Sequence, residues 1–514
     1  NYQSAVTVDW DIADNFNMKS VTAFRGTRAA EANDLDAMDI PLLTRTNFGP
    51  GTSKRSTSQW SQEFQFSGNA FDEKLDYVAG IFGFMETSRD GASAGITGPF
   101  FGGFGPNSAY YSNNRTQLDA DNSSESAFTQ MDWKFNEQWT LTGGMRFTHE
   151  KRELQRVVDD ADVAHATNDG SVATVIGGPL WNFPNGPSSF SPANTYIHNV
   201  LPSGSIADIN DQTDHVIHNA WTPMISLQRT LENIGFIETG SAYATWSKGF
   251  LSGGLSEAAD PVTNSIFDYN PEKVTNYELG FKFDALDRRV RVNTALFYMD
   301  YADRQLTSVT IDPQTARIAG IPINAKKSNI KGIEIESQLI PMDNMLVTAN
   351  VTFNKGEIEK FDDHRIVTQG GLPGAVCQAV NTGAGIVDYC PVDRSGEDLP
   401  RLPKAVYFAA IQYTFNTPIG DVVPRLQGSL RTDVDNCFDV SSCDAGVYKV
   451  NQRDISARLT WSSPDKAWSV AAYGTNLADQ RYIIGGTPLV DGTQTAGMVY
   501  NDPRMYGAEL HYSW

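Results

Sequence analysis

Apolar and polar residues alternate one by one along much of the chain, which is the two-residue period of a β-strand with two different faces. In Asn276–Asp284 every second residue is Tyr, Leu or Phe, and the residues between them are polar or glycine. Met345–Asn354 repeats the pattern. The closing Tyr506–Trp514 also alternates and ends in an aromatic residue, as the last strand of an outer-membrane β-barrel does.

The alternation predicts about seventeen strands, and the connections between them are alternately short and long. Short turns at one rim and long loops at the other are typical of an outer-membrane barrel, with turns in the periplasm and loops outside the cell. We therefore expect an all-β, antiparallel transmembrane β-barrel in the bacterial outer membrane, with a periplasmic carboxy-terminus. The predicted strands are centred near residues 8, 22, 62, 80, 128, 145, 223, 243, 278, 296, 334, 350, 408, 427, 456, 473 and 507, and the long loops cover about 31–56, 89–120, 157–214, 251–271, 361–400 and 433–447.

Hydropathy and charge argue against two other classes of protein, helical membrane proteins and nucleic-acid-binding proteins. No apolar run approaches the roughly 18 to 20 residues that a membrane helix needs, and the mean hydropathy of −0.35 suits a barrel that shows lipid only alternate residues. The net charge of −21, from 40 basic and 61 acidic residues, argues against a nucleic-acid partner. The acidity serves either solubility or the sorting of solutes.

The strand directions carry an expectation about the amino-terminus. If Trp514 lies in the periplasm, counting back places Asn1 at the extracellular rim. An unpaired first strand there would leave backbone groups unsatisfied in lipid, and single-chain bacterial barrels have even strand numbers. We expect residues 1–514 to form one barrel domain that is incomplete at its amino-terminal side.

Four cysteines fall in two close pairs, Cys377/Cys390 and Cys437/Cys443, within irregular stretches of the predicted long loops. The spacing and the lack of nearby histidines do not suit zinc. In an oxidising compartment, two local disulfides are the simplest prediction.

Several segments, taken in order along the whole chain, resemble the TonB-dependent outer-membrane receptor family. The resemblance implies a 22-stranded barrel, of which about seventeen strands are present, and a plug domain that is not in this sequence. It also implies energy coupling through TonB, contact with outer-membrane lipid and lipopolysaccharide, and active import of a scarce nutrient such as a ferric siderophore, with no enzymatic step. The segments are Leu75–Phe82, Trp221–Met224, Ala242–Phe250, Asn276–Gly280, Ala295–Tyr298, Gly332–Glu336, Asn476–Tyr482 and Pro503–Gly507.

No catalytic residue, metal site or cofactor site is predicted. The seven histidines are scattered, and no nucleophile has a base beside it in any recognisable pattern. The Asp159/Asp160/Asp162 and Asp362/Asp363 clusters could bind a hard cation such as Ca²⁺. Solvated loop charge is the interpretation we favour for both clusters.

Aromatic residues in glycine-rich loops are the candidate ligand contacts, because exposed rings stack on flat ligands. The alternative is that they pack loop on loop and close the barrel mouth. A passive porin-like channel and a surface adhesin remain as rival functions. The candidates are Phe100, Phe101, Phe104, Tyr110, Tyr111, Trp181 and Phe183.

Two further sets of residues have structural interpretations. Inward polar residues of the strands are expected to hold a plug through hydrogen bonds and ion pairs: Glu278, Lys282, Arg289, Arg291, Glu334 and Glu336. Aromatic residues near strand ends are expected to form belts at the membrane interfaces: Trp10, Tyr298, Tyr301, Trp461, Trp468 and Trp514.

Overall fold

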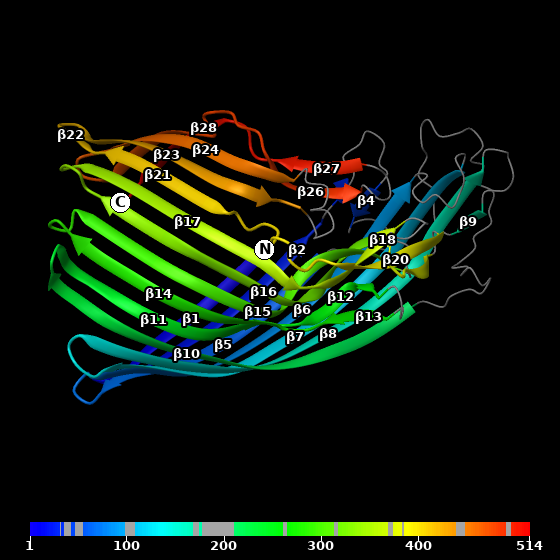
Figure 1. Cartoon of the computed structure of the whole chain (residues 1–514), viewed down its shortest axis with the longest axis horizontal. Coiled ribbons are helices and arrows are strands. Elements are labelled where there is room, and N and C mark those ends of the chain that lie inside the picture. Colours follow the sequence, from blue (N-terminus) through cyan, green and yellow to red (C-terminus); the bar gives the residue numbers. More distant parts are fainter. Residues whose placement is uncertain are drawn as a thin grey trace.

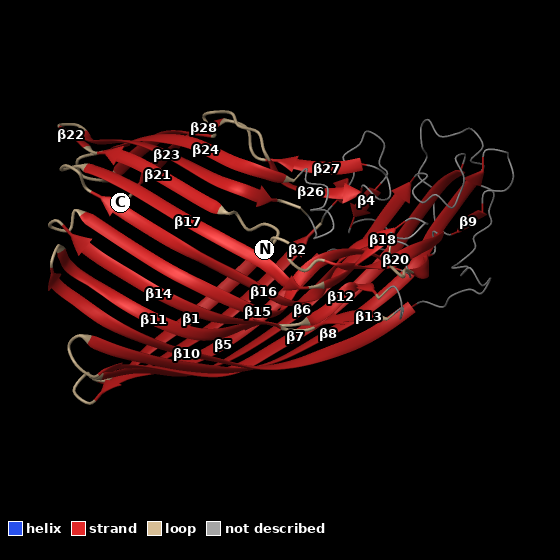
Figure 2. Ribbon diagram, in the orientation of Figure 1, coloured by secondary structure: helices blue, strands red, loops and turns tan. Residues whose placement is uncertain are grey.

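The structure is a computed structural model of the whole chain. It describes residues 1–30, 32–34, 43–46, 55–97, 108–167, 174–176, 210–260, 265–312, 317–367, 374–382, 385–437, 448–489 and 495–513. These residues form strands, turns and loops and contain no helix (Figure 2). A search of them finds no helix with the length and hydropathy to cross a membrane.

Within the described residues, seventeen long strands build one antiparallel sheet in which each long strand pairs with the next one along the chain (Figure 1). Every predicted strand centre lies inside one of them, so the alternation located all seventeen long strands correctly. Four shorter strands extend it. The long strands are β1 (Tyr2–Ala13), β2 (Phe16–Ala29), β5 (Arg55–Ala70), β6 (Leu75–Thr97), β7 (Ser108–Lys134), β8 (Trp139–Thr167), β10 (Asn210–Ile234), β11 (Ile237–Leu251), β14 (Glu272–Ala285), β15 (Val290–Asp312), β16 (Arg317–Leu339), β17 (Met345–Lys360), β21 (Ala405–Tyr413), β23 (Gly420–Asp435), β24 (Lys449–Ser462), β25 (Trp468–Thr475) and β28 (Met505–Tyr512), and the extensions are β3 (Ala32–Asp34), β4 (Leu43–Thr46), β9 (Thr174–Ile176) and β22 (Phe415–Thr417).

The two ends of the sheet differ, as the connection lengths predict. Tight turns join the strands at one end, and short extra strands gather at the other (Figure 1). We call these the turn end and the loop end. The extra strands of the loop end are β12 (Gly254–Ala259), β13 (Ile266–Tyr269), β18 (Asp362–Val367), β19 (Gln378–Thr382), β20 (Gly385–Asp393), β26 (Ile483–Leu489) and β27 (Thr495–Tyr500).

Two predicted loops, 89–120 and 157–214, are shorter than expected because the strands beside them run on. β6 and β7 stay paired as far as Thr97 and Tyr111, and β8 and β10 as far as Val158 and Asn210. These extensions carry mostly polar residues on both faces, so the hydrophobic alternation stops before the hydrogen-bonded ladder does.

One face of the sheet carries large apolar side chains that are exposed among the described residues. Ile81, Trp221, Leu279 and Leu510 are 56%, 63%, 58% and 68% exposed. In a soluble sheet these residues would form the core, whereas a barrel in a membrane turns them toward lipid. We call this the outer face and the opposite, polar one the inner face.

Aromatic rings of the inner face lie over glycines of the neighbouring strand. Tyr243 is directly opposite Gly280, and a Cβ on that glycine would clash with the tyrosine ring. Tyr473 lies over Gly507 in the same way. Covering a strand glycine with an aromatic ring buries exposed backbone and fixes the register. This packing explains why Gly280 and Gly507 stand at positions where the alternating pattern predicts a polar side chain.

Candidate functional site

The loop between β11 and β14 folds over the inner face at the loop end. Its β12–β13 hairpin places Ile266 in a buried cluster with Leu118 of β7 and Leu154 of β8. Arg156 of β8, 1% exposed, donates from Nε to the carbonyl oxygen of Glu257 at 2.8 Å. The hairpin is therefore held by apolar burial and by a charged hydrogen bond to the wall.

The loop between β17 and β21 folds over the neighbouring part of the inner face. Phe361 and Leu399 pack with Ala325, Ile330 and Ile358 of β16 and β17, and all five are at most 9% exposed. This cluster and that of the β12–β13 hairpin are the apolar cores found in the described residues. Both lie at the loop end, so burial of apolar surface stabilises the folded loops rather than the sheet itself.

A buried ion pair fastens the second loop to the wall. Asp363 is 0% exposed and accepts from Arg394 Nε at 2.7 Å and from Ser308 Oγ at 2.9 Å. Arg394 is 1% exposed and also meets Glu397 at 3.3 Å. Both carboxylate oxygens of Asp363 are thus satisfied, which such a buried charge requires. The interpretation of Asp362/Asp363 as solvated loop charge is wrong for Asp363.

A disulfide closes the small sheet formed by β18, β20 and β19. Cys377 and Cys390 are joined, with an S–S distance of 2.11 Å and a Cα–Cα distance of 4.2 Å. This confirms the first predicted disulfide. Cys437 is also disulfide-bonded, but Cys443 lies outside the described residues, so the second pairing stays a prediction.

A cavity of about 450 Å³ lies where the two folded loops meet the wall. The small sheet contributes His364, Gln378 and Tyr389, which its pairing places on one face. The rings of His364 and Tyr389 are stacked, with centroids 4.6 Å apart and planes within 4°. The rest of the lining is Asp260 and Phe267 from the β12–β13 loop, Ser308, Ile321, Ile323 and Asn324 from β15 and β16, and Phe361, Asp362, Asp363, Val376 and Pro391.

The electrostatics of the cavity favour a neutral tyrosine. Burial raises the pKa of Tyr389, and the negative charges of Asp260 and Asp363 raise it further. The phenol therefore keeps its proton at physiological pH. Asp362, on the exposed side, pairs with Lys326 at 2.9 Å.

A break in the alternation of β15 brings the wall residues to this cavity. Asp303 has a left-handed backbone, with φ of 54°. Tyr301 before it and Leu306 after it both pack on the buried cluster of the β17–β21 loop, so the inward side changes from odd to even positions there. Tyr301 was predicted to be a membrane-belt residue, and this placement corrects that prediction. Uninterrupted alternation would also have turned Ser308 away from Asp363.

The predicted ligand-contact aromatics are not tested by these coordinates. Phe100, Phe101, Phe104, Trp181 and Phe183 lie outside the described residues. Tyr110 and Tyr111 belong to β7, where they pair with His165 and Ala164, and their side chains are likewise outside the description. Within the described part of the chain, no group of three or more His, Cys, Asp or Glu residues could hold a metal ion.

The inner-face charges predicted to hold a plug have partners within the wall. Glu278 accepts from the hydroxyl of Tyr243 at 2.7 Å, and Lys282 lies 5.5 Å from the centroid of the same ring. Arg289 pairs with Asp343, and Arg291 pairs with Asp284, both at 2.7 Å. These contacts link neighbouring strands and turns, and the contact of these residues with a plug stays a prediction. Glu334 and Glu336 accept longer hydrogen bonds from Thr352 and Asn293.

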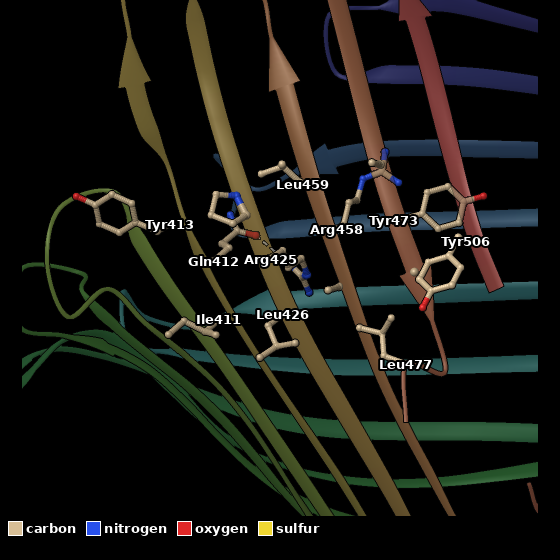
Figure 3. Close-up of a pocket in the computed structure, with 14 residues that line it drawn as sticks. Ile411, Gln412, Tyr413, Arg425, Leu426, Arg458, Leu459, Tyr473, Leu477 and Tyr506 are labelled. Carbon is tan, nitrogen blue, oxygen red and sulfur yellow. Dashed lines mark hydrogen bonds between the residues drawn. The ribbon is translucent and has the colours of Figure 1, made fainter. Parts of the chain in front are cut away.

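Three larger hollows in the described residues, of about 700, 1030 and 580 Å³, belong to the wall of the sheet. Figure 3 shows the first, where Ile411, Leu426 and Leu459 come from adjacent strands and Leu477 approaches Tyr506. The second is lined by outer-face residues such as Leu279. Apolar hollows on an outer face suit lipid chains better than a polar solute, so the loop-end cavity is the stronger candidate for ligand binding.

The sequence matches the family described as "TonB dependent receptor-like, beta-barrel" over residues 1–477. The chain belongs to this family. The members are outer-membrane β-barrels, which agrees with the apolar outer face and the two unequal ends described above. No curated protein sequence matches the chain.

Solved receptor structures share the fold at low sequence identity. The ferric yersiniabactin uptake receptor FyuA from Yersinia pestis matches with 14% identity and a TM-score of 0.65 over 99% of this chain and 60% of that one. The siderophore receptor PiuA from Acinetobacter baumannii matches with 14% identity and a TM-score of 0.59, over 99% of this chain and 64% of that one. The ferric-catecholate import receptor Fiu from Escherichia coli K12 matches with 13% identity and a TM-score of 0.54, over 99% of this chain and 63% of that one. The chain thus spans 60% to 64% of the length of these receptors.

Proposed function

We propose that this chain is the barrel of an active importer that takes a scarce nutrient across the bacterial outer membrane. The nutrient is a ferric siderophore or a similarly large ligand. In this proposal the loop end faces the outside of the cell, and the turn end and carboxy-terminus face the periplasm. Folded loops capture the ligand, and TonB acts through a plug domain to release it inward.

The observation that carries the proposal is the family match combined with the different construction of the two ends. Loops of the loop end are folded onto the inner face by two apolar clusters and a buried ion pair, and they enclose a cavity. A channel for passive diffusion needs a continuous open path, which loops folded over the inner face narrow. A receptor needs it, because a ligand site must be held in shape before the ligand arrives.

Uptake by living cells tests the proposal directly. A strain that expresses the full-length receptor should accumulate a radiolabelled ferric siderophore from a panel, and deletion of tonB or addition of a protonophore should abolish the accumulation. Binding to de-energised cells should persist, because capture precedes the energised step. Uptake that continues without TonB would contradict the proposal.

Conductance separates the importer from the porin-like rival. Full-length protein in planar bilayers should be nearly silent, because a plugged lumen does not conduct. A stable, permanently open conductance would favour passive diffusion instead. Attachment of expressing cells to host cells or matrix without any nutrient ligand would favour the adhesin.

A further inference from the structure

The β12–β13 hairpin is attached to the wall at two places that differ in chemistry. Along the hairpin, Arg156 and the apolar cluster around Ile266 hold it. At its base, Ser252 and Gly253 connect β11 to the hairpin, and Gly253 lies against His218 of β10. A guanidinium and apolar side chains keep their charge state throughout the physiological range, whereas an imidazole changes its charge at about pH 6.5. The base of the hairpin is therefore the attachment on which pH can act.

His218 lies on the inner face of β10, in the half of the strand nearer the loop end. Its Nε2 atom is buried and has no hydrogen-bond partner among the described residues. A Cβ on Gly253 would be 2.7 Å from Nε2, so the backbone of the connection packs directly on the ring. The hydroxyl of Ser252, a residue that is 5% exposed, is buried without a partner as well. A protonated ring would bring a charge and a second N–H donor to a place shielded from solvent.

The charges around the ring of His218 are balanced, two of each sign. They are those of Glu150 and Arg152 on β8, Asp268 on β13 and Lys273 on β14. Glu150, the cross-strand neighbour of His218, already lies 3.8 Å from the guanidinium of Arg152. The other titratable side chain at the base is the phenol of Tyr269, which lies over Gly254. Burial therefore decides the charge of the ring while the connection covers it, and burial favours the neutral form.

We propose that His218 is an acid-sensitive latch beneath the β12–β13 hairpin. The neutral imidazole lets the connection close over it, and protonation favours an open state in which the base of the hairpin lifts and the ring meets water. The closed state has its full stability above about pH 6.5, the pKa of an exposed histidine, and loses stability as pH falls below that value. Asp260 and Phe267 of the same loop line the loop-end cavity, so opening removes one of its walls. If the proposed function holds, ligand capture then weakens in acid.

Hydrogen exchange of the full-length receptor in detergent micelles tests the latch. Protection factors, which correct for the intrinsic pH dependence of amide exchange, are compared at pH 7.5 and pH 5.5 for peptides that cover β12 and β13. If only the open state binds the proton, the opening equilibrium shifts about tenfold over this interval for a group with an ordinary histidine pKa. We therefore expect protection of the hairpin to fall by up to about tenfold in acid. Protection of the turn between β24 and β25 should stay constant.

A matched pair of variants assigns the effect to one ring. His218→Gln is uncharged at both pH values and should abolish the fall in protection. His149→Gln replaces a histidine on the outer face of β8, which bonds to Asn219 at 2.8 Å, and should leave the fall unchanged. Heat-modifiable migration on gels verifies that each variant is folded. If His218→Gln does not fold, exchange at the imidazole C2 of wild type decides, because the latch keeps His218 neutral at a pH at which an exposed histidine is charged.

Three results would overturn the latch. Equal protection of the hairpin at the two pH values would show that the closed connection tolerates the charged ring. Greater protection in acid would mean that the imidazolium pairs with Glu150 and strengthens the closed state. A fall that persists in His218→Gln would place the titrating group elsewhere. All three are independent of the proposed function, because TonB-independent uptake would refute active import and leave the pH response of the hairpin unchanged.

Discussion

The two ends of this barrel are stabilised by different kinds of contact. At the turn end, contacts either close a short turn or lie at the surface: Ser463 accepts a hydrogen bond from the backbone N–H of Trp468, five residues on, at 2.9 Å, and the exposed Lys466 pairs with Asp421 of the neighbouring turn. At the loop end, contacts are buried and join residues far apart in sequence. Arg156 reaches a backbone oxygen 101 residues away, and Ser308 reaches a carboxylate 55 residues away.

The difference follows from what each end must do. A tight turn has only to reverse the chain, which left-handed residues such as Asp72 and Asp287 accomplish within a few positions. A folded loop must keep a defined shape in water, so it needs its own core and fully satisfied buried charges. Stability should therefore respond to substitution much more strongly at the loop end than at the turn end.

Removing Arg394 should have the largest effect. Arg394→Ala leaves Asp363 charged and buried beside Ser308 alone, which costs about 3–5 kcal/mol when a buried pair loses one partner. Hydrogen exchange of the β18 and β20 amides should accelerate accordingly. Lys466→Ala, which breaks an exposed pair at the turn end, should cost about 0–1 kcal/mol. Equal responses at the two ends would contradict the comparison.

Removing the disulfide should have the next largest effect. Cys377→Ser with Cys390→Ser opens a loop with a sequence separation of 13, which corresponds to about 3 kcal/mol in the chain-entropy description. Limited proteolysis between β18 and β21 should become faster in this variant and in reduced wild type, with no change at the turns. Unchanged cleavage would mean that the buried ion pair and apolar cluster suffice to hold the loop.

A substitution in the turn between β24 and β25 should cost less stability than removal of the buried ion pair or of the disulfide. Ser463→Ala removes the hydroxyl that accepts from Trp468 N–H and donates to Asp465, at a cost of about 1 kcal/mol. Exchange of the Trp468 amide reports the loss. Ser463→Thr keeps the hydroxyl and should behave as wild type. A loss of several kcal/mol would show that the turn end is not governed by local contacts.

The smallest expected effect is a pH response of opposite sign at the two ends. Burial raises the pKa of Asp435 at the loop end, so the charged form opposes folding and local stability increases as pH falls through that raised pKa. The hydrogen bond from Ser463 lowers the pKa of Asp465 at the turn end. Its stabilisation is complete above the unfolded-state pKa and is lost as pH falls through the lowered one.

Exchange of nearby amides between pH 3 and 7 separates these two responses. At pH 7, Asp435→Asn should slow exchange near the end of β23, because an uncharged side chain replaces a poorly solvated carboxylate. Asp465→Asn should speed exchange in its turn. If both substitutions acted in the same direction, the assignment of one carboxylate as buried and the other as hydrogen-bonded would fail.

The sheet was predictable because the information for it is local. A strand with an apolar and a polar face needs only a two-residue period, so seventeen strand centres could be placed from the alternation of residue types. An antiparallel meander then pairs each strand with the next one along the chain. The pairing of Cys377 with Cys390 was accessible for the same reason, since the partners are close in sequence. The unequal ends followed from connection lengths.

The loop-end cavity was decided by tertiary structure alone. Nothing near Asp363 in the sequence distinguishes it from its exposed neighbour Asp362, and only the fold places Ser308 and Arg394 against it. The reversal of alternation at Asp303 likewise moved Tyr301 from an expected membrane belt into a buried cluster. Burial of a loop depends on surfaces brought together across 50 to 100 residues, as the Ser308 and Arg156 contacts show, and no period along the chain encodes such contacts.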